Sequence, residues 1–157
     1  MSGTASGHDT KRSFDQKRAR HALDCVNEAR GKGEFDRYRQ SAKGLPVAIL
    51  INGLGQALAA EYASGDKGRK FLANHLACWL LDAGGTSPYR EQAGKEEGDA
   101  AVRLLNCVVK QDQHAYLWAQ REALVWLKWL KLFATAADSS GTETPDDADG
   151  KRAAGDG

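Results

Sequence analysis

The sequence lacks the features of membrane-spanning, secreted and disulfide-bonded proteins. No apolar run approaches the roughly 18 residues that a membrane-spanning helix needs, and no apolar segment follows Lys11 and Arg12, so we expect no secretory signal. The 3 cysteines form no CxxC pair, which argues against a disulfide scaffold. We therefore expect a cytoplasmic protein with no membrane contact. Its cysteines should be reduced and buried: Cys25, Cys78 and Cys107.

The sequence also lacks a nucleotide-binding motif, although residues 45–59, LPVAILINGLGQALA, suggest one at first sight. A dinucleotide fingerprint would need glycine three positions after Gly55, where Leu58 stands, and the Gly-Lys-Ser/Thr of a Walker loop is absent. Pro46 suits the first turn of a helix. Apolar residues then follow at helical spacing: Val47, Leu50, Ile51, Leu54 and Leu58. We predict a single helix here, from about Pro46 to Ser64.

What the sequence does contain is helical periodicity between two polar ends. Residues 1–12 and 138–157 have almost no large apolar side chains, so we expect a disordered N-terminal tail and a disordered acidic C-terminal tail. Between them, residues 13–137 show no period-two alternation and predict one all-α domain, a compact bundle of about six helices. The predicted helices cover about 13–31, 34–44, 46–64, 66–83, 99–112 and 113–137, with an exposed loop at 89–98 that has room for one fraying turn.

Positive charge is concentrated early in the chain, where residues 11–43 hold ten Lys or Arg against five Asp or Glu. Such a surplus attracts polyanions and indicates nucleic-acid contact. An ordinary solvated basic surface explains the same count equally well.

Two helix faces indicate contact with other molecules. In the helix from Pro46, Gly53 and Gly55 lie with Asn52 and Gln56 on a flat side, which either packs internally or receives a partner. The last helix carries a second apolar face apart from the one expected in the core, and an exposed aromatic patch is typical of interfaces. We assign protein contacts there to Trp118, Trp129 and Leu132, and on the flat side to Asn52 and Gln56.

No set of residues predicts catalysis. His21 and Cys25 lie one helical turn apart, and His75 and Cys78 share a face, so a zinc site is conceivable, but the spacing matches no known finger. A Cys-His nucleophile would need a third orienting group, and none is evident. We expect a protein that is not an enzyme and uses no cofactor or metal.

Several motifs resemble a known family. They are Gln16-Lys17-Arg18-Ala19-Arg20-His21-Ala22, the Lys43-Gly44-Leu45-Pro46 junction after Tyr38, Asn52-Gly53-Leu54-Gly55-Gln56, and Glu122-Ala123-Leu124 followed by Trp129-Leu130-Lys131. Over about residues 13–137 the chain resembles the small helical subunit of the type III-B (Cmr) CRISPR effector complex. Leu-Pro followed by Asn-Gly-Leu-x-Gln is the most specific part. The sequence departs from the family at Ala57, where the family usually has Thr, and at Ala60, where it usually has an aromatic residue.

The resemblance implies a non-catalytic subunit that stacks beside the RNA-guided backbone of the complex and helps hold target RNA in antiviral defence. Its partners would be other Cmr-type subunits including the backbone subunit, copies of itself, and the guide and target RNAs. Phosphate contacts would position RNA, since base pairing with the guide supplies specificity. The candidate RNA-binding residues are Lys17, Arg18, Arg20, Arg37, Arg39, Lys43, Arg121, Lys128 and Lys131. The alternative is a stand-alone helical nucleic-acid-binding module or regulator.

Overall fold

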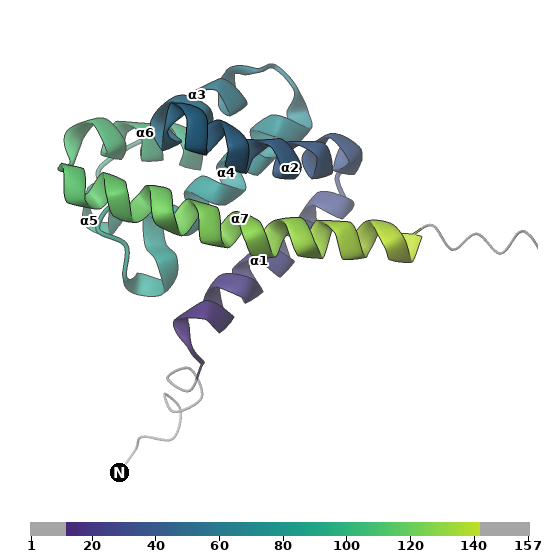
Figure 1. Ribbon diagram of the computed structural model, residues 1–157. Helices are drawn as coiled ribbons and strands as arrows, with labels where there is room; N and C mark the ends of the chain where they lie inside the picture. The colour runs from purple at the N-terminus through teal and green to yellow at the C-terminus, as the bar shows by residue number, and fades with distance from the viewer. Residues whose placement is uncertain (1–11, 142–157) are drawn as a thin grey trace, which may run out of the picture.

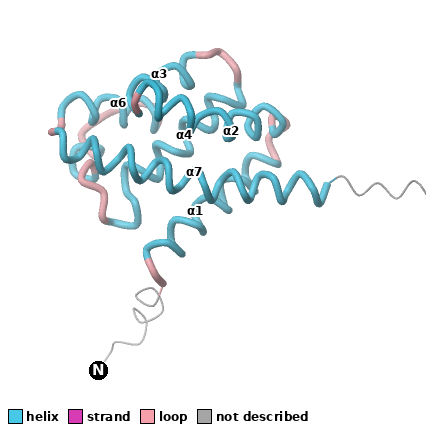
Figure 2. The backbone as a smooth tube through the Cα atoms, viewed as in Figure 1, coloured by secondary structure: helices cyan, strands magenta, loops and turns pink. Residues whose placement is uncertain are grey.

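The computed structural model describes residues 12–141, which form helices and loops without a strand (Figure 2). The predicted all-α fold is confirmed. The helices are α1 (Phe14–Arg30), α2 (Phe35–Asn52), α3 (Leu54–Ala63), α4 (Lys67–Asp82), the 3-10 turn η1 (Ala83–Gly85), α5 (Arg90–Ala93), α6 (Ala100–Lys110) and α7 (Gln113–Gly141). None of these helices combines the length and apolarity needed to cross a membrane. Of the tails expected at 1–12 and 138–157, residues 1–11 and 142–157 lie outside the described residues, whereas residues 138–141 belong to α7, which continues past the predicted boundary at 137.

Side-chain caps fix where the helices begin. The Ser13 hydroxyl accepts the backbone N–H of Gln16 while the Gln16 side chain accepts that of Ser13, a complete capping box, as the predicted start at Ser13 requires. Asp66 caps α4, and Asp112 caps α7 by accepting the N–H of Ala115 at 3.0 Å. These caps satisfy backbone donors that a helix end would otherwise leave unpaired.

The single helix predicted from Pro46 to Ser64 is wrong. One helix, α2, runs through Gly44 and Pro46 and ends at Asn52, and a separate helix, α3, begins at Leu54. Proline inside a helix costs about 3 kcal/mol, and here burial along one side of α2 offsets that cost. The buried side chains are Tyr38, Ala42, Leu45 and Ile49. Packing has therefore overridden the local stop signals.

The break between α2 and α3 occurs at Gly53, and α7 holds it in place. Gly53 has φ 87° and ψ 157°, a conformation that favours glycine. The N–H of Leu54 donates to Gln120 Oε1 at 3.0 Å, and the N–H of Gly55 donates to the Tyr116 hydroxyl at 3.1 Å. A Cβ added to Gly53 would lie 2.9 Å from that hydroxyl. Both glycines of the Asn-Gly-Leu-Gly motif thus have an internal packing role.

The long helix α7 crosses the molecule with α1 against one flank and α2 against the other (Figure 1). Its fully buried side chains Trp126, Leu127 and Leu130 meet those of α4, such as Leu72 and Leu76, in one core. Burying such side chains contributes roughly 1.5–3 kcal/mol each. Because α7 packs against α1, α2, α3 and α4, it fixes the relative positions of α1 and α2.

Two smaller predictions also need correction. The segment at 89–98 contains α5, and Tyr89 is fully buried, so the segment is anchored to the core rather than being an exposed loop. Cys25 and Cys107 are buried as predicted, but Cys78 is exposed, because it lies on the outer side of α4. All three cysteines are free.

Candidate nucleic-acid interface

Helices α2 and α7 lie side by side and antiparallel, which creates a shared outer surface (Figure 1). Two contacts fix the register. Arg39 near the start of α2 meets Asp138 near the end of α7 at 3.8 Å, and Gly53 at the end of α2 lies against Tyr116 near the start of α7. This register places Lys43 of α2 opposite Lys131 of α7.

The shared surface carries four exposed basic side chains. Arg121 and Lys128 are two helical turns apart and so lie on one face of α7, with Lys131 one turn further on. Lys43 stands exposed on the neighbouring helix, α2. No ion pair joins any of the four to a carboxylate within residues 12–141. We call this set the basic face: Lys43, Arg121, Lys128 and Lys131.

Acidic residues are almost absent from the two segments that build the basic face. No Asp or Glu occurs between Arg37 and Ala60, and Glu122 is the single acid between Gln113 and Ala137. Glu122 points away from the basic face, because its side chain is buried against α1. Asp15 of α1 lines one hollow together with Lys128, so a carboxylate lies beside that part of the basic face. Lys43, Arg121 and Lys131 come from segments that bring no exposed acid, which is what favours a polyanion.

The α2–α7 surface is different at the end of α7, because the basic side chain there, Arg39, is paired with carboxylates. Arg39 lies 3.8 Å from both Asp36 and Asp138, and its side chain is only 21% exposed. Its Nε is buried with no hydrogen-bond partner in the described chain. Arg39 thus marks the border of the basic face rather than its centre.

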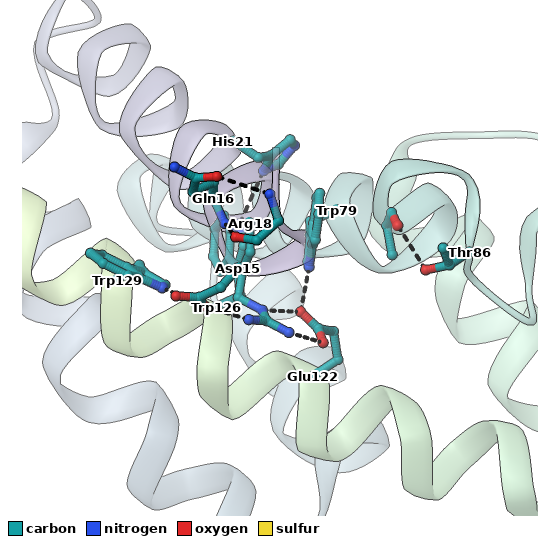
Figure 3. Close-up of polar contacts among 11 residues, drawn as sticks. Asp15, Gln16, Arg18, His21, Trp79, Thr86, Glu122, Trp126 and Trp129 are labelled. Carbon is teal, nitrogen blue, oxygen red and sulfur yellow. Dashed lines mark hydrogen bonds and ion pairs between the residues drawn. The ribbon is translucent and has the colours of Figure 1, made fainter. Parts of the chain in front are cut away.

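The candidate Arg18 has another partner. Its guanidinium forms two bonds with Glu122, from Nε at 2.5 Å and from Nη2 at 2.8 Å, and its Nη1 contacts Asp15 (Figure 3). Glu122 also accepts the indole N–H of Trp79 at 2.9 Å. Hydrogen bonding to Glu122 raises the pKa of Arg18. Side-chain exposures of 11% for Arg18 and 6% for Glu122 leave this bidentate pair little access to RNA.

The other early basic candidates lie away from the basic face. Lys17 lies over the η1 turn, since its Cδ would be 3.5 Å from a Cβ on Gly84. Arg20 is exposed on α1 and pairs with Asp24 at 3.4 Å. Arg37 pairs with Asp66 at 3.5 Å and borders a hollow of about 320 Å³ that also contains Glu61 and Arg69. These candidates therefore do not form one surface with Lys43.

The buried carboxylate in that hollow is already paired. Glu61 accepts from the Ser41 hydroxyl and from Arg69 Nη2 at 3.1 Å. Burial raises the pKa of Glu61, although Arg69 opposes the effect. The pairs hold α2, α3 and α4 together, which is a structural role.

The histidines and cysteines considered for zinc serve packing. Trp126 donates its indole N–H to His21 Nδ1 at 3.0 Å, so His21 is neutral with its proton on Nε2. Burial lowers the pKa of His21 to about 4, with a further contribution from His75. His75 Nδ1 lies 2.7 Å from the Tyr38 hydroxyl. Within residues 12–141, no group of three or more His, Cys, Asp or Glu is placed to hold a metal ion.

The residues assigned to protein contacts are all at the surface but not on one patch. Asn52 and Gln56 are exposed beside the α2–α3 break, and Trp118 borders a hollow of about 390 Å³ near the start of α7. Trp129 and Leu132 share a groove of about 300 Å³ with Asp15. Leu132 is 62% exposed, whereas Trp129 is half-buried and donates to Asp15 at 3.0 Å. That hydrogen bond lowers the pKa of Asp15.

Sequence reasoning missed three exposed apolar residues. Val47, Leu50 and Ile51 were grouped with Leu54 and Leu58 as one run of apolar residues at helical spacing, yet they are 56%, 68% and 74% exposed on the outer side of α2, while Leu54 and Leu58 are buried. Leu45 and Ile49, also at helical spacing, face inward instead. One sequence signal could have shown which residues face inward. If one helix continues from Tyr38 and Ala42, then Leu45 and Ile49 follow at helical spacing and lie on the same buried face.

The arrangement matches a known family. A family model described as CRISPR-associated protein (Cas_Cmr5) matches residues 14–137. The crystal structure of a CRISPR-associated Cmr5 family protein from Thermus thermophilus is similar, with a TM-score of 0.63 and 34% sequence identity over 80% of this chain and 96% of that chain. The family's matched region ends just before the acidic stretch at the C-terminus. As its helix motifs indicated, the chain belongs to the CRISPR-associated Cmr5 family.

Proposed function

We propose that this chain is a non-catalytic small subunit of a type III-B CRISPR ribonucleoprotein complex. In this role it stacks along the guide-RNA backbone filament and helps hold target RNA through sequence-independent contacts. Membership of the Cmr5 family supports the assignment to a Cmr-type complex. The observation that carries the RNA-holding role is the basic face, where four exposed cations form no ion pair within residues 12–141.

The basic face suits phosphate contacts better than base reading. Lysine is a flexible point charge with three donors, which binds phosphate without fixing the geometry of a base edge. A complex whose specificity comes from guide pairing needs this kind of contact. Among the sequence candidates, the geometry favours Lys43, Arg121, Lys128 and Lys131 over those on α1.

The test is charge reversal in the assembled complex. Lys43→Glu, Lys128→Glu and Lys131→Glu are combined, and target-RNA affinity is measured against salt concentration. If each lysine neutralises one phosphate, the log-log salt slope falls by about 0.7 per residue, or roughly 2 in total. A matched control reverses three exposed basic residues that lie off the face: Arg30→Glu, Lys67→Glu and Lys95→Glu. Equal slopes for both triple variants would refute the assignment.

We assign subunit contact to the groove beside Trp129 and Leu132. An exposed leucine next to an indole is typical of an interface core. Leu132→Glu should prevent co-purification with the other subunits while leaving the free energy of unfolding within about 0.5 kcal/mol, since the side chain is exposed. Val109→Glu is the control, because Val109 is 78% exposed on α6. Retention of Leu132→Glu in the complex at wild-type level contradicts this contact.

A further inference from the structure

We propose that the acidic segment 142–149 docks on the basic face of its own molecule and competes there with RNA. The competition with RNA rests on the proposed function, whereas the docking itself does not. The segment lies outside the region that the family model matches, which is residues 14–137.

Charge complementarity is the first argument. Residues 142–149 read TETPDDAD and contain no Lys or Arg. The four carboxylates are Glu143, Asp146, Asp147 and Asp149. The basic face has four cations, none of which forms an ion pair within the described chain. A run of like charge is typical of an interaction tail, and the basic face offers it unpaired positive charge.

The second argument is that an acidic residue near the end of α7 already pairs with a basic residue of α2. Asp138, on the last turns of α7, lies 3.8 Å from Arg39 of α2. This contact carries the acidic end of the chain toward α2 rather than toward α1. The segment that follows Gly141 therefore starts beside the border of the basic face.

The third argument is reach. Lys131 lies ten residues before Gly141, about 15 Å along a helix that rises 1.5 Å per residue. Eight residues can span up to about 26 Å, so residues 142–149 reach Lys131, Lys128 and, on α2, Lys43. A short tether also gives an effective concentration on the order of millimolar.

Docking of this kind is loose. Exposed ion pairs contribute about 0.2–1 kcal/mol each and are screened by salt. The segment is therefore displaced by RNA that offers many phosphates at once, and it excludes short or poorly held strands. The consequence of this docking is that RNA must exceed a threshold affinity or concentration to bind, and the ionic strength sets that threshold.

The first experiment compares two variants of the full chain with equal charge change. Asp146→Asn with Asp147→Asn removes two acids from the segment. The control, Glu91→Gln with Glu97→Gln, removes two exposed acids near α5 that make no ion pair in the described chain. Binding to a fluorescent 20-nucleotide oligouridylate is followed by anisotropy. At about 50 mM salt we expect the tail variant to bind roughly 3- to 10-fold tighter than wild type and the control less than 2-fold, with the difference lost near 0.5 M salt. Equal gains in both variants overturn the proposal.

The second experiment detects docking without RNA. Backbone amide signals of ¹⁵N-labelled full chain and of the tail variant are compared by NMR. We expect shifts at Lys43, Lys128 and Lys131 and none at Arg30 or Lys95. Absent shifts overturn the proposal. Shifts that grow with protein concentration overturn it too, because they place the segment on a second copy.

The two readouts separate this inference from the proposed function. If the lysine reversals weaken RNA binding but the tail variant changes neither readout, the inference fails and the proposed function stands. If the tail variant shifts the amide signals while lysine reversal leaves RNA binding unchanged, docking holds and the RNA-holding role fails.

Discussion

The two flanks of α7 differ in what they do with charge. On the α1 flank, Arg18 pairs with Glu122 and Asp15, and these two carboxylates also accept the indole N–H groups of Trp79 and Trp129. On the α2 flank, Lys131 of α7 and Lys43 of α2 stand exposed without an ion pair in the described chain. The same helix thus uses its ionisable residues for stability on one flank and leaves them free for a ligand on the other. Burial separates the two uses, because a buried charge must be paired whereas an exposed one need not be.

The largest effect should come from the α1 flank. Glu122→Ala leaves Arg18 and the Trp79 indole without their acceptor, and breaking a buried ion pair costs about 3–5 kcal/mol. Urea unfolding measures the change. The double variant Arg18→Met with Glu122→Leu removes both charges and should recover most of the loss. If Glu122→Ala costs less than about 1 kcal/mol, the pair does not hold α1 on α7.

The second effect is a pH dependence on the same flank. His21 is neutral in the fold, with a pKa of about 4 against about 6.5 in an unfolded chain. The unfolded state therefore binds the proton first, so stability is complete above pH ~6.5 and falls as pH drops toward 4. This loss should amount to about 3 kcal/mol.

His21→Gln supplies the control for that dependence. Glutamine keeps an acceptor for the Trp126 indole but does not titrate in this range. Its stability should fall less steeply than that of wild type between pH 6.5 and 4 in denaturant titrations at fixed salt. Parallel curves would show that His21 does not supply the slope.

A third, smaller effect tests the α2–α3 break on the other flank. Gly53→Ala should cost about 1–3 kcal/mol, because of its positive φ and the 2.9 Å approach to the Tyr116 hydroxyl. Gly44→Ala is the matched control, since Gly44 is helical with nothing within 4 Å of an added Cβ. It should stabilise the protein by up to about 1 kcal/mol. Similar changes at both positions would contradict the role of Gly53.

The smallest effect on stability belongs to the basic face. Lys128→Glu should change the free energy of unfolding by less than about 0.5 kcal/mol, since the side chain is exposed. Its effect should instead appear as salt-dependent loss of RNA affinity. A large loss of stability in this variant would mean that Lys128 has a structural partner, and the contrast between the flanks would disappear.

The sequence predicted the helical content, the starts of α1 and α4, and the membership of the family. The sequence-based predictions failed at positions where contacts between distant parts of the chain determine the structure. Nothing local shows that helix α2 continues through Gly44 and Pro46, because the stabilising contacts come from the core, and nothing local shows that Gly53 ends it against Tyr116. For the same reason Val47 and Ile51 were grouped with the buried Leu54 and Leu58, although they are exposed.

The candidate site was predicted only as a set of residue types. Counting charge could not separate Arg18 from Lys43, because the difference lies in a partner, Glu122, about a hundred positions away in the chain. The fold places four candidates on the basic face and Arg18 in a buried pair, and it separates the remaining ones among other parts of the surface. We predict that the members of the basic face are the ones that contact RNA.

The central position of α7 also has a consequence for biosynthesis. The helix that fills the core, with Trp126, Leu127 and Leu130, leaves the ribosome after the other described helices. Until then the sides of α1, α2 and α4 that pack against α7 have no cover, and Leu54 and Gly55 lack the side chains that accept their N–H groups. The core is therefore incomplete until α7 emerges, and a nascent chain stalled before Asp112 exposes those apolar sides to chaperones and proteases.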